Sequence, residues 1–223
     1  MKKIIIVIVI LAALGGAAFL YMTRPVSAPS AIPLAPSVSS EVAIPGMETF
    51  VIVPQKSEAK FEIDEVLMSA PFHVVGVTKD VSGQISVNEK DPKASMVSPI
   101  QINARTLKTD SDMRNGAIGR MILKSEANEF ITFTPTTVSA LPDKFEIGVQ
   151  YTFETTGQLT IAGTTKEAVF NVKARAVSNN EIQGIATSSL KYSDYNITIP
   201  SVPMVASVSD IVDLTFSFVA VKK

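Results

Sequence analysis

Residues 168–176 read AVFNVKARA, and this short stretch decides the fold of the chain. The apolar side chains of Ala168, Phe170 and Val172 stand at every second position, and mainly polar residues such as Lys173 separate them. Successive side chains of a β-strand point to opposite faces of a sheet, whereas those of a helix return to one face every 3.6 residues. The period of two therefore predicts a β-strand with one buried and one exposed face.

The same period of two recurs in other parts of the chain. It is present in residues 60–64 and 212–220, which place Phe61, Leu214 and Phe216 on the predicted buried face. Further strand candidates are residues 72–78, 81–88, 97–106, 130–138, 146–154, 157–162 and 181–190. Short strands at this spacing predict an all-β fold, an antiparallel barrel or sandwich, and closure into a barrel would leave no strand edge open to other chains.

One segment departs from the strand pattern. Residues 109–112 (TDSD) have the spacing of a helix-capping box, and apolar residues then follow at helical spacing: Met113, Ala117, Ile118, Met121 and Ile122. Gly116 and Gly119 lower the helix propensity of this segment. We therefore expect a short or broken helical insertion that covers one end of the barrel or one face of the sheet.

The chain begins with an unbroken apolar run, residues 4–22, that directly follows Lys2 and Lys3. As a helix this run would be about 28 Å long, close to the ~30 Å hydrocarbon core of a bilayer. It exceeds the usual apolar region of a signal peptide, so residues 1–22 are predicted to form a single transmembrane helix rather than a long cleaved signal. Because lysines tend to stay in the cytoplasm, the remainder is predicted to lie outside it, in the periplasm or at the cell surface.

Residues 23–47 have a different composition, rich in proline, serine and alanine, without apolar periodicity. Such a segment buries too little apolar surface to offset the entropy of ordering it. It is predicted to be a partly extended linker that ties the membrane helix to a folded domain spanning residues 48–223.

Composition excludes several classes of function. The formal net charge is −1 and no basic stripe is present, so nucleic acid is not an expected partner. The chain has no cysteine and one histidine, His73, which excludes zinc–thiolate sites, iron–sulfur clusters and multi-histidine metal sites. It also lacks the Gly-x-Ser-x-Gly motif of a serine hydrolase. We expect neither an enzyme nor a bound cofactor.

A set of short motifs occurs in a fixed order over about residues 49–221. They are Ser57 with Phe61, VVG at 74–76, VSGQI at 81–85, TLKTD at 106–110, RN at 114–115, EFITF at 129–133, GQLTIAGTT at 157–165, DYNI at 194–197 and DIVDL at 210–214. No single motif is specific, but the ordered set resembles the YceI-like family of bacterial lipid- or polyisoprenoid-binding proteins. The resemblance implies a lipocalin-like antiparallel barrel with a helical excursion, enclosing an apolar tunnel for long isoprenoid, quinone-type or acyl ligands without a metal.

The resemblance decides a question that the strand pattern leaves open. A barrel of this size is either filled by its own side chains or able to hold one ligand. The resemblance favours the tunnel, and the candidates for its lining are the inward-facing residues Phe61, Ile63, Val74, Phe133, Leu159, Ile161, Phe170, Val172, Leu214 and Phe216. Arg114 is a candidate for contact with a ligand head group, or it forms a surface ion pair with an acid such as Asp110. His73 is expected to make a structural hydrogen bond.

The predicted function is that of a membrane-tethered, extracytoplasmic protein that binds a long apolar lipid. The main alternative is a non-catalytic structural or partner-binding module of the cell envelope. The sequence leaves open whether two domains pair as a homodimer.

Overall fold

A computed structural model describes residues 27–30, 46–201 and 205–223. The predicted transmembrane helix over residues 1–22 and most of the linker over residues 23–47 lie outside the described residues. Within the described part of the chain, every helix is too short or too polar to reach across a bilayer.

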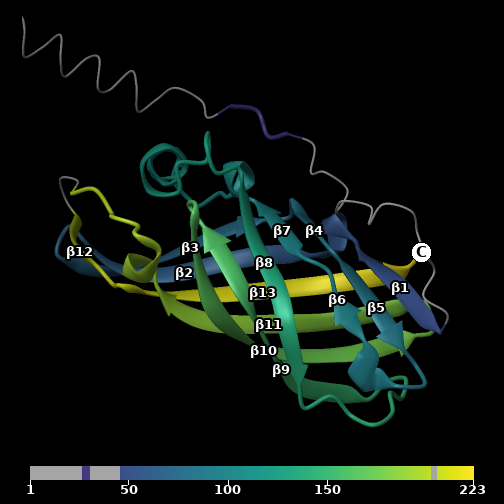
Figure 1. The fold of residues 1–223 in the computed structure, drawn as a ribbon. Coiled ribbons are helices and arrows are strands. Elements are labelled where there is room, and N and C mark those ends of the chain that lie inside the picture. Colours follow the sequence, from purple (N-terminus) through teal and green to yellow (C-terminus); the bar gives the residue numbers. More distant parts are fainter. Residues whose placement is uncertain (1–26, 31–45, 202–204) are drawn as a thin grey trace, which may run out of the picture.

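The described residues form thirteen strands and a few short helical segments (Figure 1). The strands are β1 (Met47–Ile52), β2 (Glu58–Leu67), β3 (Ala70–Thr78), β4 (Val81–Ser82), β5 (Gln84–Asn88), β6 (Met96–Val97), β7 (Ile100–Asn103), β8 (Phe130–Ser139), β9 (Gln150–Ile161), β10 (Thr164–Ser178), β11 (Glu181–Lys191), β12 (Val205–Val208) and β13 (Ile211–Lys222). The helical segments are η1 (Pro54–Lys56), η2 (Pro92–Ala94), η3 (Ala104–Thr106), α2 (Asp112–Ala117), η4 (Ile118–Ile122) and η5 (Tyr192–Tyr195).

All strands belong to one curled antiparallel sheet, which confirms the predicted all-β class. Its main order is β4-β7-β8-β9-β10-β11-β13-β1-β5-β6, and β2 joins it by pairing with β13, β3 and β12. Gly83 alone separates β4 from β5, so the segment from Val81 to Asn88 pairs with β7 at one end of the order and with β1 at the other. The sheet is a half-barrel with one short helix, consistent with a lipocalin-like fold.

Several predicted strand boundaries were wrong. Parts of the candidates 146–154 and 157–162 join in one continuous strand, β9, because Thr155 and Thr156, which lie between the candidates, also pair with β10. The candidate 97–106 is divided into β6, β7 and the helical turn η3. Strand β1 was not predicted, although Phe50 and Ile52 are among its most buried residues.

The helical insertion is present but begins later than predicted. Ser111, not Thr109, is the N-cap: its hydroxyl accepts the backbone N–H of Arg114 at 3.4 Å. Thr109 instead donates its N–H (2.7 Å) and hydroxyl (2.8 Å) to the side-chain oxygen of Asn115. The α-helical part, α2, gives way to the π-helical turn η4, whose Ile118 packs into the core.

Gly157 allows β8 and β9 to lie unusually close together. A Cβ atom at this position would stand 2.4 Å from the carbonyl oxygen of Thr134 and 2.8 Å from the ring of Phe133. Because a backbone atom cannot yield as a flexible side chain does, we expect Gly157→Ala to lower the free energy of unfolding by about 1–3 kcal/mol in urea denaturation. Thr152→Ala, on the exposed face of β9, should change it by less than about 0.5 kcal/mol; equal effects would contradict this account.

Candidate functional site

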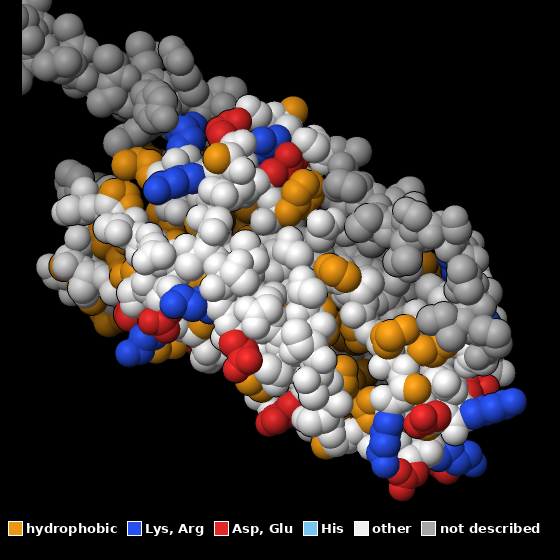
Figure 2. Space-filling view, in the orientation of Figure 1, with side chains coloured by type: hydrophobic (Ala, Val, Ile, Leu, Met, Phe, Trp, Pro, Cys, Tyr) orange, Lys and Arg blue, Asp and Glu red, His pale blue; other side chains and the backbone are white. Residues whose placement is uncertain are grey.

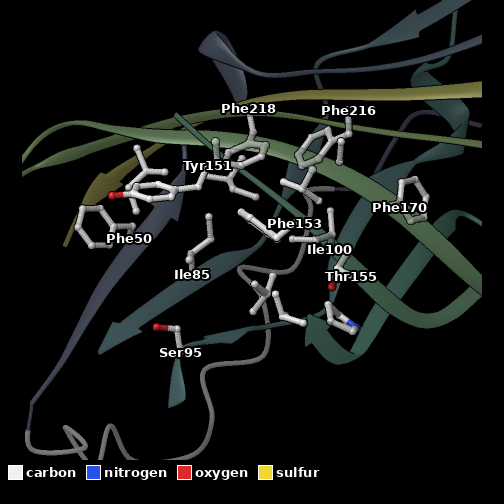
Figure 3. A pocket seen from close by; sticks show the side chains of 18 of the residues that line it. Phe50, Ile85, Ser95, Ile100, Tyr151, Phe153, Thr155, Phe170, Phe216 and Phe218 are labelled. Carbon is white, nitrogen blue, oxygen red and sulfur yellow. The ribbon is translucent and has the colours of Figure 1, made fainter. Parts of the chain in front are cut away.

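The curled sheet encloses a cavity of about 740 Å³ with an apolar lining. Phe216 and Phe218 from β13 approach it on one side, and Ile85 from β5 and Ile100 from β7 on the other (Figure 3). In the space-filling view, hydrophobic side chains are visible inside a hollow of the surface (Figure 2). Its volume is within the range of small-molecule pockets, about 300–1,000 Å³.

At one end the lining of the cavity is apolar. Strand β9 lines it from Tyr151 to Ile161, and the Ile161 end lies beside Leu107 and Ile131. Buried residues of the neighbouring helical segments, including Ile118, join the same core there. We call this end, where η3, α2 and η4 lie, the helical end.

The opposite end combines apolar side chains such as Phe145 and Ile147 with the polar side chains of the lining. The pairing of β9 with β10 places Arg175 against Gln150, so Arg175 and Tyr151 lie at the same end of the sheet. The lining residues with polar side chains at this end are Glu48, Glu89, Ser95, Lys144, Glu146, Arg175, Ser178 and Asn179. We call this end the mouth; its mixture of carboxylate, cationic, amide and hydroxyl groups could contact the polar part of a ligand.

The structure brings most of the predicted lining residues together around this cavity. The residues that line it are Phe61, Phe133, Leu159, Ile161, Phe170, Val172, Leu214 and Phe216. Ile63 and Val74 do not. Ile63 and Val74 pair with each other across β2 and β3. Ile63 is the next inward-facing residue after Phe61 in the direction of the turn at Met68 and Ser69, and there the two strands extend beyond the cavity.

Sequence reasoning missed part of the lining. Phe50 and Ile52 went unnoticed because β1 directly follows the linker and was not predicted. Tyr151 and Phe153 alternate with Thr152 and Glu154, so the period of two already indicated that they share one face.

Arg114 lies outside the lining. Its guanidinium donates to Glu65 Oε1 at 2.9 Å, forms an ion pair with Asp110 four residues earlier, and lies 5.4 Å from the centre of the Phe72 ring. The surface ion pair with Asp110 is thus present, and the same guanidinium ties α2 to the β2–β3 hairpin. This geometry gives no support to a head-group role.

His73 forms the expected structural hydrogen bond on the exposed side of β3. Its Nδ1 lies 2.7 Å from Asp64 Oδ1, and its Nε2 lies 3.4 Å from Glu62 Oε1. The hydrogen bond to Asp64, followed by that to Glu62, raises the pKa of His73. A raised pKa means that the charged pair contributes fully below about pH 6.5 and is lost as the pH rises through the higher folded-state value.

Asp64→Asn should therefore lower the pKa of His73 toward its ordinary value of about 6.5. Since His73 is the one histidine of the chain, an NMR titration of the imidazole reads this group directly. Asp143→Asn, which removes a surface partner of Lys93, is the matched control and should leave the His73 titration unchanged. An unaltered titration in Asp64→Asn would show that the pair does not form.

Comparisons with known proteins agree with this architecture. The family model of the YceI-like domain matches residues 50–220. BcnA of Burkholderia cenocepacia is similar in structure, with a TM-score of 0.59 and 18% identity over 75% of this chain and 98% of that one. A polyisoprenoid binding domain from Saccharophagus degradans, implicated in plant cell wall breakdown, is also similar in structure. Its TM-score is 0.61, with 13% identity over 78% of this chain and 98% of that one.

A YCEI protein of Campylobacter jejuni gives a TM-score of 0.54 with 19% identity over 66% of this chain and 84% of that one. At these identities the solved structures show a shared fold alone. None of the curated proteins matches the chain.

Proposed function

The chain belongs to the YceI-like family, and on that premise we propose that it binds a long apolar lipid inside its curled sheet, without catalysing a reaction. The ligand would be a polyisoprenoid, an isoprenoid quinone or a fatty-acyl chain. The observation that carries the proposal is the apolar cavity of about 740 Å³, which the side chains of the strands leave unfilled. The structurally similar domain of Saccharophagus degradans, described as polyisoprenoid binding, supports the same ligand class.

The length of the cavity favours a long chain. It borders β9 from Tyr151 to Ile161, ten residue steps, so its length is at most about 33 Å at the rise of a strand. A bilayer's hydrocarbon core is ~30 Å thick and contains two leaflets, so one acyl chain of a membrane lipid spans about 15 Å. A ligand that fills the cavity end to end is therefore up to about twice as long as such a chain, which favours an isoprenoid over a fatty acid.

The energetics favour a carrier or a buffer over a permanent lipid store. Burial of one CH₂ group away from water contributes ~0.8 kcal/mol, so a long chain taken from water would seem to exceed the ceiling of non-covalent affinity, about 20 kcal/mol. The ligand, however, starts in a bilayer that is as apolar as the cavity. Its transfer is nearly neutral, and selectivity then comes from the shape of the cavity and the polar groups of the mouth.

We further propose that residues 1–22 anchor the protein in a membrane and that the domain acts outside the cytoplasm. The apolar run at residues 4–22 behind Lys2 and Lys3 supports this proposal. An anchor would keep the cavity within tens of ångströms of its lipid source.

The test is the lipid that purifies with the protein. The full chain, expressed in a host that makes isoprenoid quinones, is extracted with organic solvent and analysed by mass spectrometry. We expect one class of long-chain lipid in near-stoichiometric amount. An extract with only bulk membrane phospholipid would reject the proposal and favour the structural or partner-binding alternative.

A further inference from the structure

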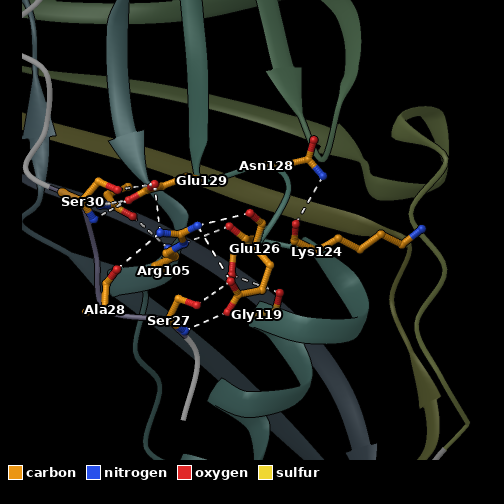
Figure 4. A network of polar contacts seen from close by, with 11 residues as sticks. Ser27, Ala28, Ser30, Arg105, Gly119, Lys124, Glu126, Asn128 and Glu129 are labelled. Atoms are coloured by element: carbon orange, nitrogen blue, oxygen red, sulfur yellow. Dashed lines mark hydrogen bonds and ion pairs between the residues drawn. The ribbon is translucent and has the colours of Figure 1, made fainter. Parts of the chain in front are cut away.

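A short piece of the linker is bound to the body of the domain. In this piece, Ser27 donates its N–H to Glu126 Oε1 (2.7 Å) and its hydroxyl to Oε2 (2.6 Å). Ser30 binds Glu129 in the same way, at 2.6 and 2.8 Å (Figure 4). Two serines spaced three residues apart thus face two carboxylates with the same spacing, and each carboxylate accepts two hydrogen bonds from one serine.

Arg105 completes the binding site from the side of the domain. Its side chain is only 11% exposed, and it donates from Nη1 to the carbonyl oxygen of Ala28 at 3.3 Å. The same guanidinium holds the acidic segment in place, through the carbonyl oxygens of Ser125 (3.0 Å) and Glu126 (3.1 Å) and an ion pair with Glu129 (3.0 Å). The N–H and hydroxyl groups of the two linker serines therefore meet carboxylates of the domain, and the carbonyl oxygen of Ala28 meets the guanidinium of Arg105.

The charge state of the site suits this contact at neutral pH. The hydrogen bonds from the side chain and the backbone of Ser27 lower the pKa of Glu126. Arg105 and Glu129 are the other charged groups at the contact, and Asp80 lies within electrostatic range of Glu129. The pKa of Glu129 is lowered as well, so both glutamates are ionised and accept hydrogen bonds at neutral pH.

The position of this contact is unexpected, because β1 begins at the other end of the sheet. Met47 pairs with Asn88, and Glu48 lines the mouth, whereas Glu126 lies four residues beyond the last residue of η4, at the helical end. The two ends are about 36 Å apart, judged from the twelve residues of β9. The chain passes the helical end at residues 27–30 before it enters the sheet at the mouth (Figure 1).

We propose that Arg105, Glu126 and Glu129 form a clamp for the linker segment Ser27–Ser30, and that the closed clamp holds the helical end of the domain toward the N-terminal segment with the mouth facing away. With the clamp closed, four residues separate Met22 from Ser27, a reach of at most about 18 Å. With the clamp open, twenty-three residues separate Met22 from Gly46 at the mouth end, about 27 Å as a coil and far more when extended. The clamp thus decides which end faces the membrane, a consequence that rests on the proposed membrane anchor.

The absence of cysteine allows clean spin labelling of the full chain. Labels on Thr23→Cys and Lys124→Cys are measured by double electron–electron resonance in detergent and again in liposomes. The closed clamp predicts a narrow distance distribution below about 30 Å for this pair, because few residues separate either label from the Ser27–Glu126 contact. A second pair, Thr23→Cys with Asn179→Cys at the mouth, should give distances at least 10 Å longer.

The clamp is opened by Ser27→Pro with Ser30→Pro, which removes both donors of each serine without touching the folded domain. In this variant we expect a broad distribution for the Thr23–Lys124 pair and a shorter mean for the Thr23–Asn179 pair. Ser37→Pro with Ser40→Pro is the matched control, since it changes two serines of the same spacing in the same linker. Distributions that agree between the clamp variant and the control would overturn the proposal.

The two proposals fail separately. If lipid is absent from the extract while the label distances respond to Ser27→Pro with Ser30→Pro, the clamp stands and the lipid-binding function falls. If lipid is present but the label distances do not change in Ser27→Pro with Ser30→Pro, the lipid-binding function stands and the clamp is rejected. Flotation with liposomes tests the membrane anchor on the same samples.

Discussion

Ala174→Phe is expected to abolish lipid binding while leaving the sheet folded. Ala174 lies on the inward face of β10, pairs with Tyr151 and lines the cavity near the mouth. A ligand that enters from the mouth must pass this point before it reaches Phe153 and Phe170. A ring in this position blocks the passage, so we expect the amount of lipid that purifies with the protein to fall at least tenfold.

Val169→Phe is the matched control for this prediction. It adds a ring to the same strand, but on the outer face, where the Val169 side chain is 44% exposed. The control should retain its lipid, and both variants should unfold within about 1.5 kcal/mol of the parent chain, because Ala174→Phe expands into empty space. If Ala174→Phe binds lipid as well as Val169→Phe does, the cavity is not the binding site.

The sequence predicted which faces of the strands are buried far better than it predicted whether the space between them is filled. Phe170 and Val172 point inward as the period of two requires, and so do Leu214 and Phe216. The same pattern, however, would arise in a solid core. Whether side chains from opposite strands meet and fill the cavity depends on the curvature of the sheet. That curvature is set by the order of all the strands, so no short stretch of sequence predicts it.

Residues whose roles depend on distant partners were the hardest to predict. Arg114 had two readings from the sequence, and Glu65, forty-nine residues away in β2, is the partner that no local pattern revealed. The clamp is a stronger case. Ser27 and Glu126 are ninety-nine residues apart, and serines in a proline-rich linker look alike until the fold places carboxylates beside two of them.

Arg105→Leu is expected to destabilise the domain by about 2–4 kcal/mol. The guanidinium donates to the carbonyl oxygens of Ser125 and Glu126 and pairs with Glu129, which links η3 to the segment that follows η4. Leucine matches much of its volume but removes the guanidinium donors of the two carbonyl oxygens. It also removes the cation beside the Glu129 carboxylate, whose side chain is only 14% exposed and which keeps its hydrogen bonds from Ser30. Arg105→Lys keeps the charge but loses the planar fork, so about half of the loss should remain in urea denaturation.

The pH dependence of the unfolding free energy of Arg105→Leu shows whether the variant is destabilised by the lost ion pair or by lost packing. Burial raises the pKa of Asp80, and the nearby Glu129 adds to that effect. Without Arg105, Glu129 loses its cationic partner but keeps the repulsion from the nearby Asp80, so the pKa of Glu129 should rise. Protonation then relieves the repulsion, and the difference in unfolding free energy between the parent and Arg105→Leu should shrink as the pH falls from 7 to 5. A difference that stays constant over this range would mean that Arg105 stabilises the domain through packing alone.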